Sequence, residues 1–224
     1  MIETSSQNKI ADYKAFIENK EFACVAARAA LAHNQISCMV AGHMACPKDD
    51  VEILNFIYTF VDKYRNSTEP FQSVSIIFDA PETFSEEEFD NLMWLRLQAL
   101  SNLDARNFSY DNRVDINPQS PDFSFSLKEE AFFIIGLHPA SSRPTRQFKY
   151  PTLVLNPHAQ FETLRKNNQY TKMKSIIRKR DIAFSGSINP MLEDFGTASE
   201  VYQYSGKKYD QQWTCPLKLQ HAKP

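Results

Sequence analysis

The sequence predicts an α+β fold, a single domain with a central, mostly antiparallel sheet packed by helices on one main side. Its 224 residues can bury one sizeable core and do not require two. Short apolar runs rich in aromatic and β-branched residues, the strand signal, lie in the middle of the chain. Segments with helical apolar spacing lie at both ends of that series. We expect residues 1–10 to be a disordered N-terminus, 11–217 to form the domain, and 218–224 to be a flexible tail.

The elements follow from local patterns taken in order. Helices are predicted over residues 11–19, 22–33, 48–64, 85–104 and 170–180 and from His158 onward, and strands over 73–78, 123–127, 132–137 and 152–155. Ser85 with Glu88 forms a capping-box pattern that starts its helix. Asn156 and Pro157 give an N-cap and first-turn signal before His158.

A loop with small thiols packed against the core is predicted for residues 33–46. His33, Cys38, His43 and Cys46 lie in it, but their spacing lacks the tight pairs of a structural zinc site.

The composition is that of a soluble protein. Hydrophobic residues make up 42% of the chain and charged residues 23%, and the net charge of −2 gives no electrostatic case for nucleic acid. The basic run over 172–180 is predicted to be a solvated helix face. Because no signal peptide or membrane-length apolar segment is found, a cytoplasmic protein with reduced cysteines and no membrane partner is expected.

The candidate site lies around a polar turn between two predicted strands. His138 follows the first strand and His158 the second. Between the histidines lie Ser141, Ser142, Arg143 and Arg146. Two imidazoles at the ends of neighbouring strands, beside hydroxyls and guanidiniums, predict a cofactor or anion site. From the residues alone, each histidine could equally be a structural imidazole.

Other motifs narrow the chemistry. The sequence contains no GxxxxGK[ST], GxGxxG or GxSxG motif, so neither nucleotide binding nor a serine-hydrolase elbow is indicated. Cys215, before Pro216, is a candidate thiolate ligand or nucleophile, or else a core thiol beside Trp213.

Several long motifs occur in one order: FSFSLxxxAFFIIGLHPASSRPTRQF, PTLVLNPHAQFETLR, IRKRDIAFSGSINPML, DFGTASE, YQYSG and WTCPL. In these motifs the chain, from about Glu21 to Leu217, resembles the YqcI/YcgG family. Characterised relatives in that family are haem-dependent oxygenases that N-hydroxylate guanidine groups. The resemblance therefore implies haem b (iron protoporphyrin IX) as cofactor and molecular oxygen as co-substrate.

The resemblance also implies a role for each candidate side chain. His158, at a strand-to-helix junction, is the first choice for the axial ligand of the iron, with His138 or Cys215 as alternatives. Arg143 and Arg146 are suited to haem propionates or a substrate carboxylate.

The remaining roles concern the substrate. Ser141 and Ser142 are expected to donate hydrogen bonds to the same carboxylates or to bound oxygen. Glu200 and Asp194 are candidates for a carboxylate that fixes a guanidinium, although helix capping or surface solvation would explain them as well.

The leading prediction is a haem-dependent monooxygenase that N-hydroxylates a guanidine- or amine-bearing small molecule, arginine-like in chemistry. Since no flavin or nicotinamide site is evident, an external electron donor, a reductase or ferredoxin, is implied. A homodimer is compatible with the sequence. The alternatives are a non-catalytic haem-binding or haem-sensing protein, and a haem-free domain in which both histidines are structural.

Overall fold

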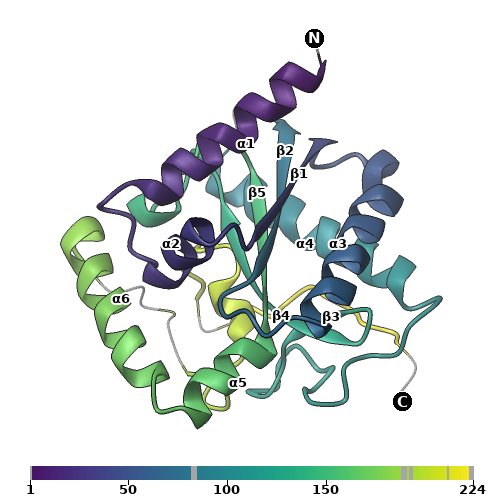
Figure 1. Cartoon of the computed structure of the whole chain (residues 1–224). Coiled ribbons are helices and arrows are strands. Elements are labelled where there is room, and N and C mark those ends of the chain that lie inside the picture. Colours follow the sequence, from purple (N-terminus) through teal and green to yellow (C-terminus); the bar gives the residue numbers. More distant parts are fainter. Residues whose placement is uncertain (1, 82–84, 188–190, 192–193, 211, 222–224) are drawn as a thin grey trace.

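The computed structural model describes residues 2–81, 85–187, 191, 194–210 and 212–221, with residues 2–4 as backbone only. Its helices are α1 (Ile2–Glu18), α2 (Val25–Ala32), α3 (Asp50–Arg65), α4 (Glu86–Asp104), α5 (His158–Lys166) and α6 (Tyr170–Ser185). Its strands are β1 (Ile36–His43), β2 (Ser73–Ala80), β3 (Phe125–Leu127), β4 (Glu130–Leu137) and β5 (Thr152–Pro157). Short 3-10 helices lie at η1 (Pro47–Asp49), η2 (Pro144–Arg146) and η3 (Glu200–Gln203). Figure 1 shows the helices around a central sheet.

The sheet confirms the predicted α+β class and its mostly antiparallel character. Its strand order is β1-β2-β5-β4-β3, and only the β1–β2 pair is parallel among the described pairs. The four predicted strands correspond to β2, β3, β4 and β5. The loop predicted over 33–46 was wrong, because residues 36–43 form the edge strand β1, in register with β2 from Ile36 opposite Ser73. An edge strand of mostly small, half-buried residues lacks the long apolar run that identifies β4 and the aromatic alternation that identifies β3.

Helices cover both faces of the sheet, which corrects the expectation of one main side. On β2, Val74, Ile76 and Phe78 face the core beneath α3 and α4, whereas Ile77 faces α1 and α2. Because successive side chains of a strand point to opposite faces, each strand contributes apolar residues to the core on both sides of the sheet. Helices α5 and α6 lie on the α1–α2 side (Figure 1).

The N-terminal segment was expected to be disordered, but helix α1 begins at Ile2. The helix predicted over 11–19 is confirmed as the second half of α1, where Tyr13 and Ile17 are buried. In the earlier turns, Lys9 forms an ion pair with Asp79 at 2.9 Å. Tertiary contacts of this kind override the weak local pattern.

The C-terminal segment differs from the expected flexible tail. Residues 218–221 pack against α4, and the ring of His221 is buried with Nε2 2.9 Å from Asp104 Oδ2. Residues 222–224 of the predicted tail lie outside the described residues.

Two helix starts test the capping predictions. The Ser85 hydroxyl accepts a hydrogen bond from the Glu88 amide at 3.1 Å, which confirms Ser85 as the N-cap of α4. Asn156 is not a cap: Pro157 occupies the N-cap of α5, and the Asn156 amide donates to the Phe133 carbonyl at 3.3 Å. No helix in the described ranges is long and apolar enough to cross a membrane.

Candidate functional site

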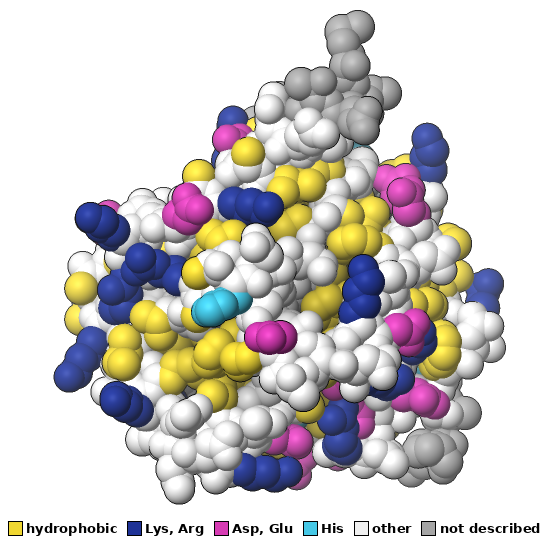
Figure 2. Space-filling view, viewed as in Figure 1, with side chains coloured by type: hydrophobic (Ala, Val, Ile, Leu, Met, Phe, Trp, Pro, Cys, Tyr) yellow, Lys and Arg dark blue, Asp and Glu magenta, His cyan; other side chains and the backbone are white. Residues whose placement is uncertain are grey.

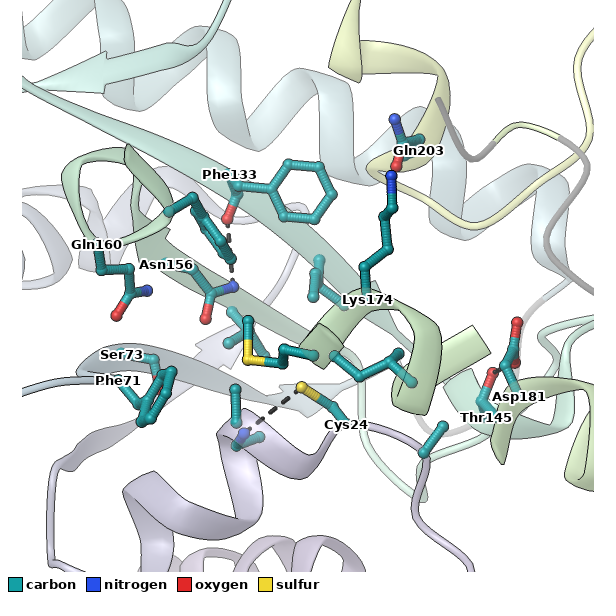
Figure 3. A pocket seen from close by; sticks show the side chains of 18 of the residues that line it. Cys24, Phe71, Ser73, Phe133, Thr145, Asn156, Gln160, Lys174, Asp181 and Gln203 are labelled. Carbon is teal, nitrogen blue, oxygen red and sulfur yellow. Dashed lines mark hydrogen bonds between the residues drawn. The ribbon is translucent and has the colours of Figure 1, made fainter. Parts of the chain in front are cut away.

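A cleft of about 300 Å³ lies between the sheet and helices α2, α5 and α6. Its floor is apolar and is formed by Phe133 and Ile135 of β4 and by Val154 of β5. Figure 3 shows Phe133 and Asn156 on the strands, with Cys24 at the start of α2 and Lys174 on α6 on other sides of the cleft. The cleft is partly open to solvent.

His158 lines this cleft at the first residue of α5. Its exposed fraction is 3%, and neither ring nitrogen has a hydrogen-bond partner among the described residues. Phe195 packs on the ring with centroids 4.3 Å apart, and the nearest carboxylate, Glu162, is 3.8 Å from Nε2. Burial first, then the charges of Arg165 and Arg113, lower the His158 pKa to about 4. The side chain is therefore a neutral imidazole at pH 7, the form that binds metals.

His138 lies elsewhere, which corrects the expectation that the two histidines form one site. Strands β4 and β5 are antiparallel, with Leu137 opposite Thr152 and Phe132 opposite Pro157. The two strand ends are thus about 17 Å apart at ~3.4 Å per residue. His138 is fully buried and stacks on Phe89 of α4, with centroids 4.1 Å apart. It does not line the cleft.

Ser141 and Ser142 accompany His138 and also lie outside the cleft lining. The Ser141 hydroxyl accepts from the Arg143 amide at 3.2 Å, and the Ser142 amide donates to Glu86 at 2.8 Å. Their placement assigns them to the turn after β4, and the predicted contact with a ligand beside His158 is not supported.

Arg143 and Arg146 do reach the cleft, but both guanidiniums are engaged by the protein. Arg143 forms an ion pair with Asp181 at 2.6 Å. Arg146 donates to the Gln203 and Tyr204 carbonyls, each at 2.7 Å, and so fastens η3 to the end of β4. Burial and the charge of Arg143 lower the pKa of Arg146 to about 10, so it remains a cation at pH 7.

Glu200 is the carboxyl group that best matches the predicted cation anchor. It lines the cleft at 4% exposure, and its Oε1 accepts hydrogen bonds from the Tyr204 and Ser124 hydroxyls, the latter at 2.8 Å. No described cation lies within ion-pair distance of it, and burial raises its pKa to about 8. Asp194 is different, since Lys174 pairs with it at 2.7 Å and lowers its pKa.

Sequence reasoning missed two cations of the cleft, Arg165 on α5 and Arg178 on α6. Neither forms an ion pair with a described residue, and Arg178 Nε is buried without a hydrogen-bond partner there. Arg165 stacks over Tyr170 with its guanidinium carbon 4.6 Å from the ring centre. The sequence did contain one signal for Arg165: a helix that starts at His158 brings residue 165, two turns later, to the same side as His158.

Cys215 packs against the core beneath α3 and α4 and does not line the cleft. Burial raises its pKa to about 12, so the side chain is a thiol at pH 7 and a poor metal ligand. Within the described ranges, no group of three or more His, Cys, Asp or Glu side chains could hold a metal ion without further ligands.

The model of the YqcI/YcgG family matches residues 13–218. The chain belongs to the YqcI/YcgG family. It is also 25% identical, over 182 residues, to the uncharacterized protein YcgG of Bacillus subtilis, which covers 78% of this chain and 71% of the relative. No solved structure matches the chain significantly. The family match includes the cleft and His158.

The arrangement combines three chemical properties. A neutral imidazole whose ring nitrogens have no described hydrogen-bond partner lies in a mainly apolar cleft, arginines belong to its lining, and a buried carboxyl group with no described ion-pair partner lies in the same lining. These groups offer an apolar surface, positive charge for an anionic group, a neutral nitrogen for a metal centre and a carboxyl group for a cation.

Proposed function

We propose that this YqcI/YcgG protein is a haem-dependent monooxygenase that N-hydroxylates a guanidine- or amine-bearing small molecule, with His158 as axial ligand. The observation that carries the proposal is the His158 ring, buried at the cleft wall with neither nitrogen hydrogen-bonded to a described residue. A buried polar atom without a partner costs about 1–3 kcal/mol, so its retention points to a ligand.

The residues present fit haem in three respects. One protein ligand suffices for haem iron, and His158 offers a neutral nitrogen. Phe133, Ile135 and Val154 provide an apolar wall. Arg165 and Arg178, rather than Arg143 and Arg146, have guanidiniums available for the propionates. When bound, haem would supply the oxygen activation that protein side chains lack.

Glu200 supports a cationic substrate. A guanidinium that reached its carboxyl group would favour the ionised form, and a charge-assisted hydrogen bond to one carboxylate oxygen would help to fix which nitrogen faces the reacting centre. The hydroxyls of Ser124 and Tyr204 already hold Oε1 in place, which leaves Oε2 for the ligand. The four free cysteines support the proposal that the protein works in the cytoplasm.

The test is to express the protein with a haem supply and measure the haem content by the pyridine haemochromogen method. Arginine and its neutral isostere citrulline are then added while the absorption spectrum is followed. We expect near-stoichiometric haem, a spectral response to arginine but not to citrulline, and loss of that response in Glu200→Gln, which keeps the haem.

Other results separate the alternatives. Haem binding with no response to any guanidine would point to a haem-binding or haem-sensing protein. A protein that takes up no haem would contradict the proposal and leave a haem-free domain.

A further inference from the structure

The charge of the chain is unevenly distributed, and the unevenness centres on α5 and α6. Residues 158–185 contain seven lysines and arginines against two acidic residues, whereas the rest of the chain contains 18 against 25. This segment therefore has a net charge of +5 on a protein whose total is −2. The space-filling view shows dark blue side chains along the side where α6 lies (Figure 2).

The outward face of α6 combines this charge with exposed apolar side chains. Lys172, Ile176 and Lys179 are exposed at helical spacing, and Ile182 follows one turn later. Of the five large hydrophobic residues exposed in the described ranges, three belong to this helix: Ile176 at 40%, Ile182 at 44% and Phe184 at 38%. Phe184, two residues after Ile182, points to a different side of the helix. We call Lys172, Ile176, Lys179 and Ile182 the α6 stripe.

The lysines of the stripe make no ion pair with a described residue, unlike Lys174, which pairs with Asp194 on the inner side. A solvated helix face explains the lysines but not the two isoleucines among them. Apolar contacts with a basic surround are typical of a surface that binds an acidic protein, since opposite charges steer the encounter.

The same helix lines the cleft with its inner side. Met173, Ile177 and Arg178 face the cleft, so the stripe is separated from it by one helix, about 10 Å across. A partner bound to the stripe would therefore lie close to whatever the cleft holds. An electron donor must bind close to the group that it reduces, whereas a membrane surface has no such requirement. The short distance between stripe and cleft therefore favours an electron donor.

We propose that the α6 stripe is the docking surface for a small acidic electron-transfer protein, an inference that rests on the proposed oxygenase function. N-hydroxylation by one O₂ consumes two electrons and two protons, since one oxygen atom enters the product and the other leaves as water. The partner supplies these electrons one at a time and is itself oxidised. Interfaces of this kind are small and bind weakly, as the limited area of one helix face requires.

The test uses haem-loaded protein and a plant-type [2Fe–2S] ferredoxin, an acidic one-electron donor, as the probe. Binding is measured by isothermal calorimetry at 20 mM and 300 mM NaCl. The double variant Lys172→Glu/Lys179→Glu is compared with Lys48→Glu/Lys63→Glu, which changes the net charge equally at exposed lysines of η1 and α3. Neither pair lines the cleft.

We expect binding at low salt that weakens at least tenfold at high salt, and a further loss of about tenfold in the α6 variant alone. The rate of haem reduction by reduced ferredoxin should fall in parallel, while reduction by dithionite stays unchanged. Equal effects of the two double variants, or no ferredoxin binding, would overturn the inference. So would binding to phosphatidylserine vesicles that depends on the stripe in the absence of ferredoxin binding.

The assay separates failure of the inference from failure of the proposed function. If the protein takes up no haem, the oxygenase proposal fails whatever the ferredoxin does. If haem is bound and dithionite reduces it, but ferredoxin ignores the stripe, only the docking inference fails.

Discussion

Neighbouring side chains of one strand are buried to different degrees on the two faces of the sheet. Beneath α4, Phe132 and Ile134 of β4 are completely buried, whereas Phe133 and Ile135, which point to the other face, remain half-buried in the cleft. The two histidines follow the same division. His138 is stacked on Phe89 inside the sealed face, and His158 faces the cleft.

The comparison shows that burial alone does not identify a functional histidine. Burial lowers the pKa of both imidazoles to about 4, so both are neutral at pH 7. What distinguishes His158 is its place in the lining of an open cleft, where a ligand can reach a ring nitrogen. We call the α3–α4 side the sealed face and the α2–α5–α6 side the open face.

Truncation of aromatic side chains should separate the two faces most strongly. Phe89→Ala removes a fully buried ring of the sealed face and should lower the free energy of unfolding by about 3–5 kcal/mol. Phe133→Ala removes a half-buried ring at the cleft floor and should lower the free energy of unfolding by roughly 1 kcal/mol, because part of the ring surface is already hydrated. Urea unfolding measures both, and equal losses would contradict the division.

Glu200 should make stability on the open face depend on pH. Its pKa rises from an ordinary 4.5 to about 8 in the folded protein. Between these values the unfolded chain releases a proton that the folded protein keeps, so the free energy of unfolding falls as pH rises, by up to ~1.4 kcal/mol per pH unit.

Glu200→Gln keeps the acceptor for Ser124 and Tyr204 but cannot ionise. It should match the parent protein near pH 4.5 and exceed it at pH 7.5, by roughly 2–4 kcal/mol. Thermal unfolding at the two pH values checks this. A difference between the two proteins that is the same at both pH values would show that Glu200 is ionised in the fold.

Haem affinity should depend on one histidine only. His158→Ala should weaken haem binding by about 100-fold, equal to ~2.7 kcal/mol, because the axial bond is lost. His138→Ala should change it by less than about threefold after correction for any unfolded fraction. Competitive haem transfer from a haem-donating globin measures both. A larger effect of His138→Ala would move the site to the sealed face.

The smallest difference concerns the caps of two helices, one on each face. Ser85→Ala removes the hydroxyl that caps α4 and should cost about 1 kcal/mol. Cys24 caps α2 through its sulfur, a weak acceptor that lies 3.4 Å from the Ala27 amide nitrogen. Cys24→Ala should therefore cost less than ~0.5 kcal/mol in chemical denaturation. A larger loss for Cys24→Ala would mean that its sulfur also supports the cleft wall.

Much of the fold could be read from the sequence where the local signal is strong. The apolar β-branched runs predicted β2, β4 and β5, and Ser85 predicted the start of α4. The missed elements depend on distant partners. The first turns of α1, before the predicted helix at 11–19, are held by contacts such as the ion pair of Lys9 with the distant Asp79, and β1 is an edge strand whose ladder comes from β2.

The candidate site could be predicted only in part, again because the rest depends on how distant segments pair. His158 and Glu200 were identified from the residues and the family resemblance, and both line the cleft. His138 and the two serines were misplaced because strand direction is not encoded in the apolar pattern, and an antiparallel pair sends the two histidines to opposite ends. Arg178 was missed because a basic helical run is more typical of a solvated face.

The most direct test of His158 as the axial ligand is chemical rescue. His158→Gly and His138→Gly are prepared with haem, and their spectra are recorded with and without added imidazole. If His158 is the axial ligand, His158→Gly loses the native Soret band and regains it with imidazole, while His138→Gly shows the native band throughout. A native band in His158→Gly without imidazole, or rescue confined to His138→Gly, would contradict this assignment.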